Sequence, residues 1–116
     1  SAGIFLQSRN VGNVVANNIV VASAGGDCVA VGGSMNSGNV FDRSVYSGGA
    51  VSGVSGGANS ITADPRLVDP TNGDLHLGPG SPAIDAGDAS LGDPGAVDID
   101  GQPRQVGALD IGADER

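Results

Sequence analysis

Glycine and proline interrupt this chain so often that long helices cannot form in it. The 116 residues include 21 Gly and 6 Pro, which recur at short intervals along the whole sequence. Gly loses more backbone entropy in a helix than any other residue, and Pro lacks the N–H that a helix requires. The apolar residues between them are mostly Val, Ile, Leu and Ala, with two Phe, one Tyr and no Trp. The sequence therefore predicts an all-β protein whose short strands surround a thin core.

A recurring pair in the first half predicts how those strands are arranged. The pair is a polar residue followed by Ile or Val, and it returns every 21 residues, as Asn18-Ile19, Asn39-Val40 and Ser60-Ile61. A repeat of this length is typical of one coil of a parallel β-helix, whose coils stack about 4.8 Å apart. We expect Ile19, Val40 and Ile61 to stack in one column, with Asn18 and Asn39 forming hydrogen-bonded corners beside it.

The predicted strands are short and differ in pattern from those of a β-sandwich. They cover residues 14–22, interrupted at Asn17-Asn18, and residues 28–31, 39–41 and 43–46. A β-sandwich remains the alternative, but it would show a cleaner two-residue alternation than residues 14–21 do. Residues 1–60 are therefore interpreted as about three coils. Residues 61–116, rich in Asp-Pro, Asn-Gly and Ser-Pro turns, are expected to form a loop-rich cap continuous with the same domain.

Five motifs of the second half occur in an order that resembles a known family. They are Asp64-Pro65-Arg66-Leu67, Gly73-Asp74-Leu75-His76-Leu77, Gly80-Ser81-Pro82-Ala83-Ile84-Asp85-Ala86-Gly87-Asp88, Asp98-Ile99-Asp100-Gly101-Gln102-Pro103-Arg104 and Asp110-Ile111-Gly112-Ala113. This series is similar to the C-terminal region of bacterial secreted β-helix proteins, often described as choice-of-anchor Q domains. The chain departs from the family pattern at Asp114 and Leu75, where the family usually or often has an aromatic residue.

The resemblance implies a right-handed parallel β-helix closed by the Asp-rich segment. It also implies an exported protein, at the cell surface or in the medium, with no defined enzymatic activity in this segment. Within that segment Asp64, Asp85 and Asp110 are interpreted as structural residues at turns. Arg104 is the only Arg or Lys between residues 67 and 115, and we expect it to hold Asp85 or Asp110 through its guanidinium group.

Charge excludes several classes of partner. The formal net charge is −8, the chain has no Lys, and its five Arg form no cluster. Such a chain is a poor ligand for nucleic acid and for anionic lipid surfaces. No segment is apolar enough over a sufficient length to predict membrane insertion. A surface glycan or a second copy of the chain remains a candidate partner.

The sequence predicts no catalytic residue and no resident cofactor. Most Asp residues lie beside Pro or Gly, where carboxylates close turns. Asp98 and Asp100 are the candidates for a calcium site built from oxygen ligands, although their spacing excludes an EF-hand. His76 lies between two leucines, so alternation predicts an exposed surface histidine. Cys28 precedes an apolar run and is expected to be a buried small apolar residue.

The function that these observations favour is a structural end module without catalysis. The apolar run Ile4, Phe5 and Leu6 would expose unpaired backbone and apolar side chains on the first coil, which favours self-association there. Two alternatives stay open. One is an extracellular filament or assembly subunit, and the other is a fragment of a carbohydrate-active β-helix enzyme whose catalytic coils precede residue 1.

Overall fold

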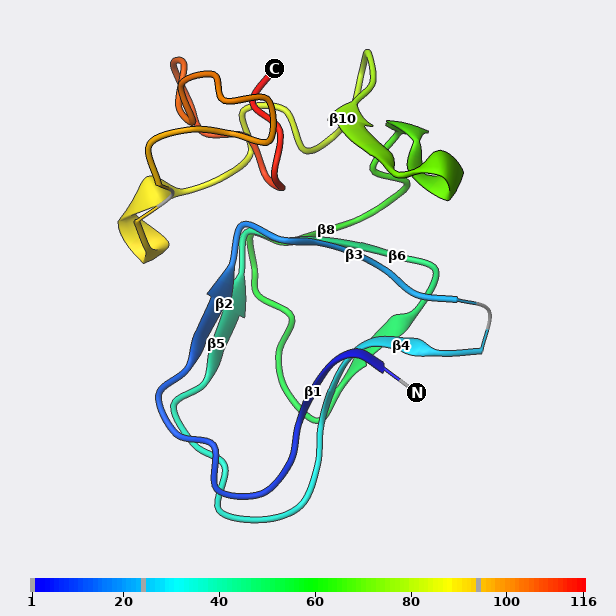
Figure 1. Ribbon diagram of the computed structural model, residues 1–116. Coiled ribbons are helices and arrows are strands. Elements are labelled where there is room, and N and C mark those ends of the chain that lie inside the picture. The colour runs from blue at the N-terminus through cyan, green and yellow to red at the C-terminus, as the bar shows by residue number, and fades with distance from the viewer. Residues whose placement is uncertain (1, 24, 94) are drawn as a thin grey trace.

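The computed structural model describes residues 2–23, 25–93 and 95–116 (Figure 1). Ten short strands and two single-turn 3-10 helices are found in these residues. The strands are β1 (Ala2–Leu6), β2 (Val14–Ala16), β3 (Ile19–Val21), β4 (Asp27–Val31), β5 (Val40–Asp42), β6 (Val45–Ser47), β7 (Ala50–Ser52), β8 (Ile61–Thr62), β9 (Leu67–Asp69) and β10 (Asp74–Leu77). The helices are η1 (Pro70–Asn72) and η2 (Ala89–Leu91), and neither has the length or the apolar character needed to cross a membrane.

The first eight strands pair in parallel within three small sheets. Their orders are β1-β4-β7, β2-β5 and β3-β6-β8. In the third sheet Ile19 pairs with Val45, and Val45 pairs with Ile61. The stretch of chain from Val45 to Ile61 is much shorter than the stretch from Ile19 to Val45. β9 and β10 form a separate antiparallel pair with an irregular register. The spacing of paired strands along the chain is therefore not constant.

The predicted right-handed parallel β-helix is contradicted by this arrangement. The chain forms an all-β globule of short parallel and antiparallel sheets, and in the described residues no sheet closes or continues as a solenoid. A solenoid stacks repeat upon repeat, each on its neighbours, along one axis. Here the step from Val45 to Ile61 is far shorter than the step from Ile19 to Val45. Beyond Thr62 the Pro- and Gly-rich sequence adds no further parallel strand in the part described.

The predicted column of Ile19, Val40 and Ile61 is also wrong. Ile19 and Ile61 flank Val45 in one sheet, whereas Val40 pairs with Val14 in another. The 21-residue repeat in the sequence therefore does not equal the number of residues that separate paired positions.

Asparagine amides do bond from one strand layer to the next, but between positions other than those predicted. Asn13 Nδ2 donates to Asn39 Oδ1 at 2.9 Å, and the backbone N–H of Asn10 donates to Asn36 Oδ1 at 3.0 Å. The counterpart of Asn18 is Ser44, whose hydroxyl accepts the Asn18 N–H at 3.4 Å. Asn39 therefore bonds to Asn13 and Asn18 to a serine, and the asparagine with a left-handed backbone is Asn17, with a φ of 59°.

The three parallel sheets enclose the first of two apolar cores. Its buried members are Val20, Cys28, Val29, Phe41 and Tyr46, with Ile4 and Leu6 among the half-buried residues packed against them. Successive side chains of a strand point to opposite faces, and Val20 of β3 and Tyr46 of β6 are the ones that face this core. Cys28 is fully buried, as the sequence predicted.

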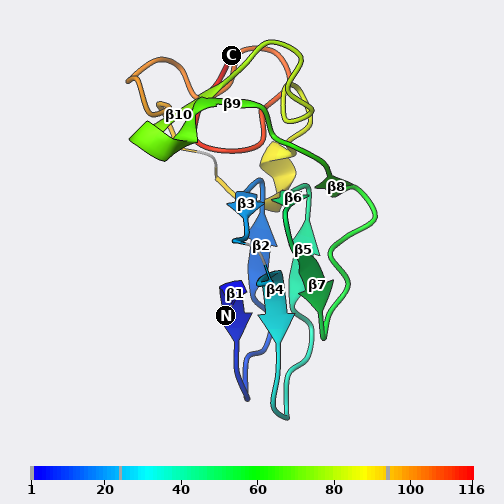
Figure 2. The same ribbon diagram turned by 90° about the vertical axis from the view of Figure 1, so that its right-hand side faces the viewer.

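The C-terminal segment, residues 63–116, covers one sheet on its outer side. Val45 from β6 packs there with Leu77, Ala83 and Ile111, and these four form the second buried core. Ile19 and Ile61 of the same sheet pack against it. Figures 1 and 2 show the segment lying over β3, β6 and β8 rather than across the end of the strand stack. The apolar surface that the segment covers belongs to the face of this sheet.

Candidate functional site

One buried ion pair lies in the C-terminal segment. Arg104 Nη1 lies 3.1 Å from Glu115 Oε2, and the two side chains are 8% and 1% exposed. Arg104 also donates to the backbone carbonyls of Asp110 and Gly112. Arg104 thus holds a carboxylate of this segment as expected, but the partner is Glu115 and not the side chain of Asp85 or Asp110.

The carboxylate of Glu115 organises the backbone around the pair. Its Oε1 accepts the N–H of Val106 at 2.9 Å, and its Oε2 accepts the N–H of Asp110 at 3.0 Å. A buried charge costs free energy unless it is paired and hydrogen-bonded. Glu115 meets both conditions, so it joins the turn around residue 106 to residue 110.

Asp110 connects two loops through backbone N–H groups. Its Oδ1 accepts the N–H of Asp85 and its Oδ2 accepts the N–H of Arg116, both at 2.6 Å. Asp110 is fully buried, while the side chain of Asp85 is exposed and its backbone has a φ of 57°. Asp110 therefore joins the backbone of Asp85 to that of Arg116, and Asp85 takes part through its backbone. The exposed Asp64 closes a turn by accepting the N–H of Arg66 at 2.8 Å.

Asp98 and Asp100, the calcium candidates, point to different partners. Asp98 is buried, and it accepts the N–H groups of Asp100, Gln102 and Glu115 at 2.9 to 3.2 Å. Burial raises the pKa of Asp98, but these hydrogen bonds outweigh it and hold the pKa below its usual range. The oxygens of Asp98 are thus engaged by backbone N–H groups, while Asp100 Oδ2 lies beside His76 Nε2, and a calcium site at this pair stays a prediction.

A half-buried histidine lies beside them. His76 Nδ1 is 2.5 Å from Asp74 Oδ1, and Nε2 is 2.6 Å from Asp100 Oδ2. The bond to Asp74, followed by the bond to Asp100, raises the pKa of His76 to about 9. The same bond to the ring lowers the pKa of Asp74. His76 is therefore a cation at neutral pH, held between two carboxylates.

The position of His76 was only partly predicted. Alternation placed Leu75 and Leu77 on one face, but Leu75 is exposed and Leu77 is buried. The register of β9 and β10 shifts between Asp74 and Leu77, so simple alternation fails there. A usable signal was present, since Asp74 and His76 are two residues apart and side chains at that spacing share a face of a strand.

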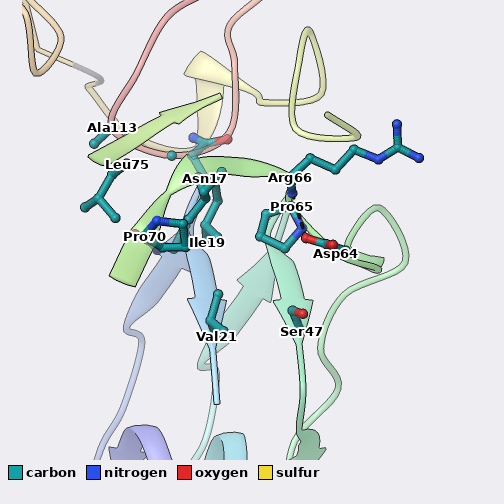
Figure 3. A pocket seen from close by; sticks show the side chains of 13 residues that line it. Asn17, Ile19, Val21, Ser47, Asp64, Pro65, Arg66, Pro70, Leu75 and Ala113 are labelled. Atoms are coloured by element: carbon teal, nitrogen blue, oxygen red, sulfur yellow. Dashed lines mark hydrogen bonds between the residues drawn. The ribbon is translucent and has the colours of Figure 1, made fainter. Parts of the chain in front are cut away.

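A groove of about 700 Å³ separates the β9–β10 hairpin from the ends of β3 and β6. Figure 3 shows Ile19, Val21 and Leu75 on its walls, while the guanidinium of Arg66 points away from the labelled side chains. Both side-chain groups of Asn17 bond to the backbone of Asp88. The polar groups along the groove therefore do not converge on a common point.

Comparison with models of known protein families found no match, and no curated protein sequence matched the chain. The resemblance of residues 64–113 to choice-of-anchor Q domains therefore stays a prediction.

Proposed function

We propose that this chain is a non-catalytic structural module of an exported bacterial protein, and that it associates with a second copy of itself. The observation that carries the proposal is a layer of three open strand edges. β1, β2 and β3 are each the terminal strand of a parallel sheet, and their outer edges pair with no strand in the part of the chain described. They lie on the same side of the molecule, at the left in Figure 2. Unpaired strand edges are templates for pairing with another chain.

The carboxylates support a role without catalysis. Hydrolysis of a glycoside needs two carboxylates facing one substrate at a defined separation. The buried acids Asp98, Asp110 and Glu115 instead accept backbone N–H groups at both oxygens. Among the described residues that line the 700 Å³ groove, Asp64 alone carries a carboxylate. This chemistry favours the structural function over the carbohydrate-active alternative.

Export of the protein rests on the motif resemblance of residues 64–113. The absence of Lys and the net charge of −8 fit an extracellular protein whose copies repel one another at long range. Association through β1, β2 and β3 must therefore come from backbone pairing and apolar contact rather than from charge.

The three residues predicted to mediate association divide between two faces of β1. Ile4 and Leu6 are half-buried and pack against the first core. Phe5 points outward and is 57% exposed. A second copy placed against the open layer would continue both the backbone pairing and the apolar column that Ile4 and Leu6 begin. Contact between two identical edges is isologous and stops at a dimer. Contact between this layer and β5, β7 and β8, which end the same sheets on the other side, would be head-to-tail and would propagate into a filament.

We expect Phe5→Asp to weaken this association strongly, because the carboxylate would be placed beside the pairing edge. Sedimentation velocity over a wide range of protein concentration measures it. The wild type should move from monomer to dimer as concentration rises, while Phe5→Asp stays monomeric. Val68→Asp is the matched control, since Val68 is 56% exposed but lies on β9. A wild type that stays monomeric at the highest concentration, with native circular dichroism, would refute the dimer. Species that keep growing beyond the dimer would instead favour a filament subunit.

A further inference from the structure

His76 lies where three separate segments of the chain meet. It belongs to β10, whereas Asp100 follows in the turn after Asp98 and Asp114 comes from the C-terminal residues. One nitrogen of His76 and one carboxylate oxygen from each Asp lie within 4.8 Å of one another. The three residues are far apart in the sequence, so the fold and not a local turn brings them together.

Asp74 fixes the orientation of the imidazole ring. Its Oδ1 accepts the ring N–H at Nδ1, 2.5 Å away, and also the backbone N–H of His76 at 3.2 Å. A carboxylate on one ring nitrogen is the usual support of a metal-binding histidine, because it sets the tautomer and makes the other nitrogen a better ligand. Nε2 is thereby the nitrogen that faces Asp100.

Asp114 supplies an oxygen that the protein does not use. The residue is buried, with only 5% of its surface exposed. Oδ2 accepts the N–H of Leu77 at 2.8 Å, whereas Oδ1 accepts no hydrogen bond from the described residues. Oδ1 is not sealed from solvent, because Arg43 Nε is the one fully buried side-chain atom without a partner among the described residues, so an ion can reach this oxygen. Three carboxylates around one imidazole also leave an excess of negative charge for a cation.

We propose that His76, Asp100 and Asp114 bind a divalent transition-metal cation of the zinc type. Such ions take one imidazole nitrogen together with carboxylate oxygens, whereas calcium and magnesium prefer oxygen ligands alone. The mixed donor set therefore distinguishes this site from the calcium pair Asp98 and Asp100. Three protein ligands leave the fourth position of a tetrahedral ion to water. The role is structural, because the ion joins β10 to the Asp100 turn and to the C-terminal residues.

Only a small rearrangement is needed to admit the ion. Ligands at about 2.1 Å from a tetrahedral ion lie about 3.4 Å from one another. His76 Nε2 and Asp100 Oδ2 are now 2.6 Å apart, so they must separate by about 0.8 Å. The Asp100 side chain is 39% exposed and has room to turn outward. The proton on Nε2 leaves to solvent as the nitrogen–metal bond forms.

The test uses the untagged chain, stripped with chelator and titrated with zinc chloride. His76 is the only histidine, so its ring resonances in nitrogen NMR report this site without any substitution. We expect one zinc per chain by calorimetry, a shift of the Nε2 resonance that saturates at the same ratio, and a rise in melting temperature with zinc concentration. Calcium at the same concentration should produce none of the three. An Nε2 resonance that zinc leaves unmoved would overturn the proposal.

Three variants separate this site from a nonspecific acidic surface. His76→Gln should abolish stoichiometric binding, and Asp74→Asn should weaken it by about 10- to 100-fold through loss of the ring's support. Asp64→Asn removes the same charge from an exposed turn outside the cluster, and its zinc affinity should equal that of the wild type. Equal weakening in Asp74→Asn and Asp64→Asn, or binding retained in His76→Gln, would contradict the site. The outcome is independent of self-association, because the titrations are run at concentrations where the chain is monomeric.

Discussion

Glu115→Gln is expected to lower the free energy of unfolding by about 3–5 kcal/mol. Glutamine has nearly the same shape but no charge, so the guanidinium of Arg104 would remain buried without its anion. The replacement also gives up one of the oxygens that accept the N–H groups of Val106 and Asp110. Removing one partner of a buried pair costs far more than the pair contributes, because the other charge cannot regain water. Urea unfolding followed by circular dichroism measures the loss.

The matched control for Glu115→Gln is Asp64→Asn, which removes one negative charge at an exposed turn. Its effect should stay within about 0.5 kcal/mol, as for most surface substitutions. If Glu115→Gln lowers the free energy of unfolding by less than about 1 kcal/mol, the Arg104–Glu115 ion pair behaves as an exposed pair. The buried hydrogen-bond network around it would then be wrong.

Ile111→Ala is expected to cost about 2–5 kcal/mol through the cavity it leaves in the second core. Ile111 is fully buried and packs with Val45, Leu77 and Ala83. Because Val45 lies on β6, the loss should reach the strands as well as the C-terminal segment. Tyr46 is the only tyrosine and lies in the first core next to Val45, so its fluorescence reports the strands. We expect Tyr46 fluorescence and circular dichroism to shift together in the variant.

Ile99→Ala is the same substitution at an exposed site of the same segment, and it should change stability by no more than about 0.5 kcal/mol. Two transitions in Ile111→Ala, with the Tyr46 signal unchanged from the wild type, would mean that the segment unfolds separately. A shared transition would support one cooperative unit.

The positions of the early strands could be predicted from the sequence, but their pairing could not. Residues 14–22, with a break at Asn17-Asn18, correspond to β2 and β3, and residues 28–31 lie within β4. A short apolar run indicates a strand that is covered on both faces, because successive side chains point to opposite sides. The register depends on loop lengths, and the chain takes a much shorter path from Val45 to Ile61 than from Ile19 to Val45. The regular repeat of a polar residue followed by Ile or Val does not reveal that these two stretches of chain differ in length.

The candidate site was found in part for a similar reason. Arg104 was predicted to hold a carboxylate, since it is the only Arg or Lys in a long acidic stretch. Its partner, Glu115, could not be distinguished from Asp85 or Asp110, because spacing does not reveal which oxygens the backbone already engages. The cluster of His76, Asp100 and Asp114 depends on an irregular hairpin register and on long-range contacts. Only the Asp74-His76 spacing was visible in the sequence.

The carboxylates of the C-terminal segment act as structural acceptors of backbone N–H groups. Amide hydrogen exchange tests this role most directly, since the segment has little regular structure that could protect those groups otherwise. The amides concerned are those of Leu77, Asp85, Asp110, Glu115 and Arg116. We predict exchange slowed on the order of a thousandfold or more, which corresponds to about 4 kcal/mol of opening free energy. Exchange of these five amides within about tenfold of the rate of an unfolded peptide would mean that the carboxylates do not hold them.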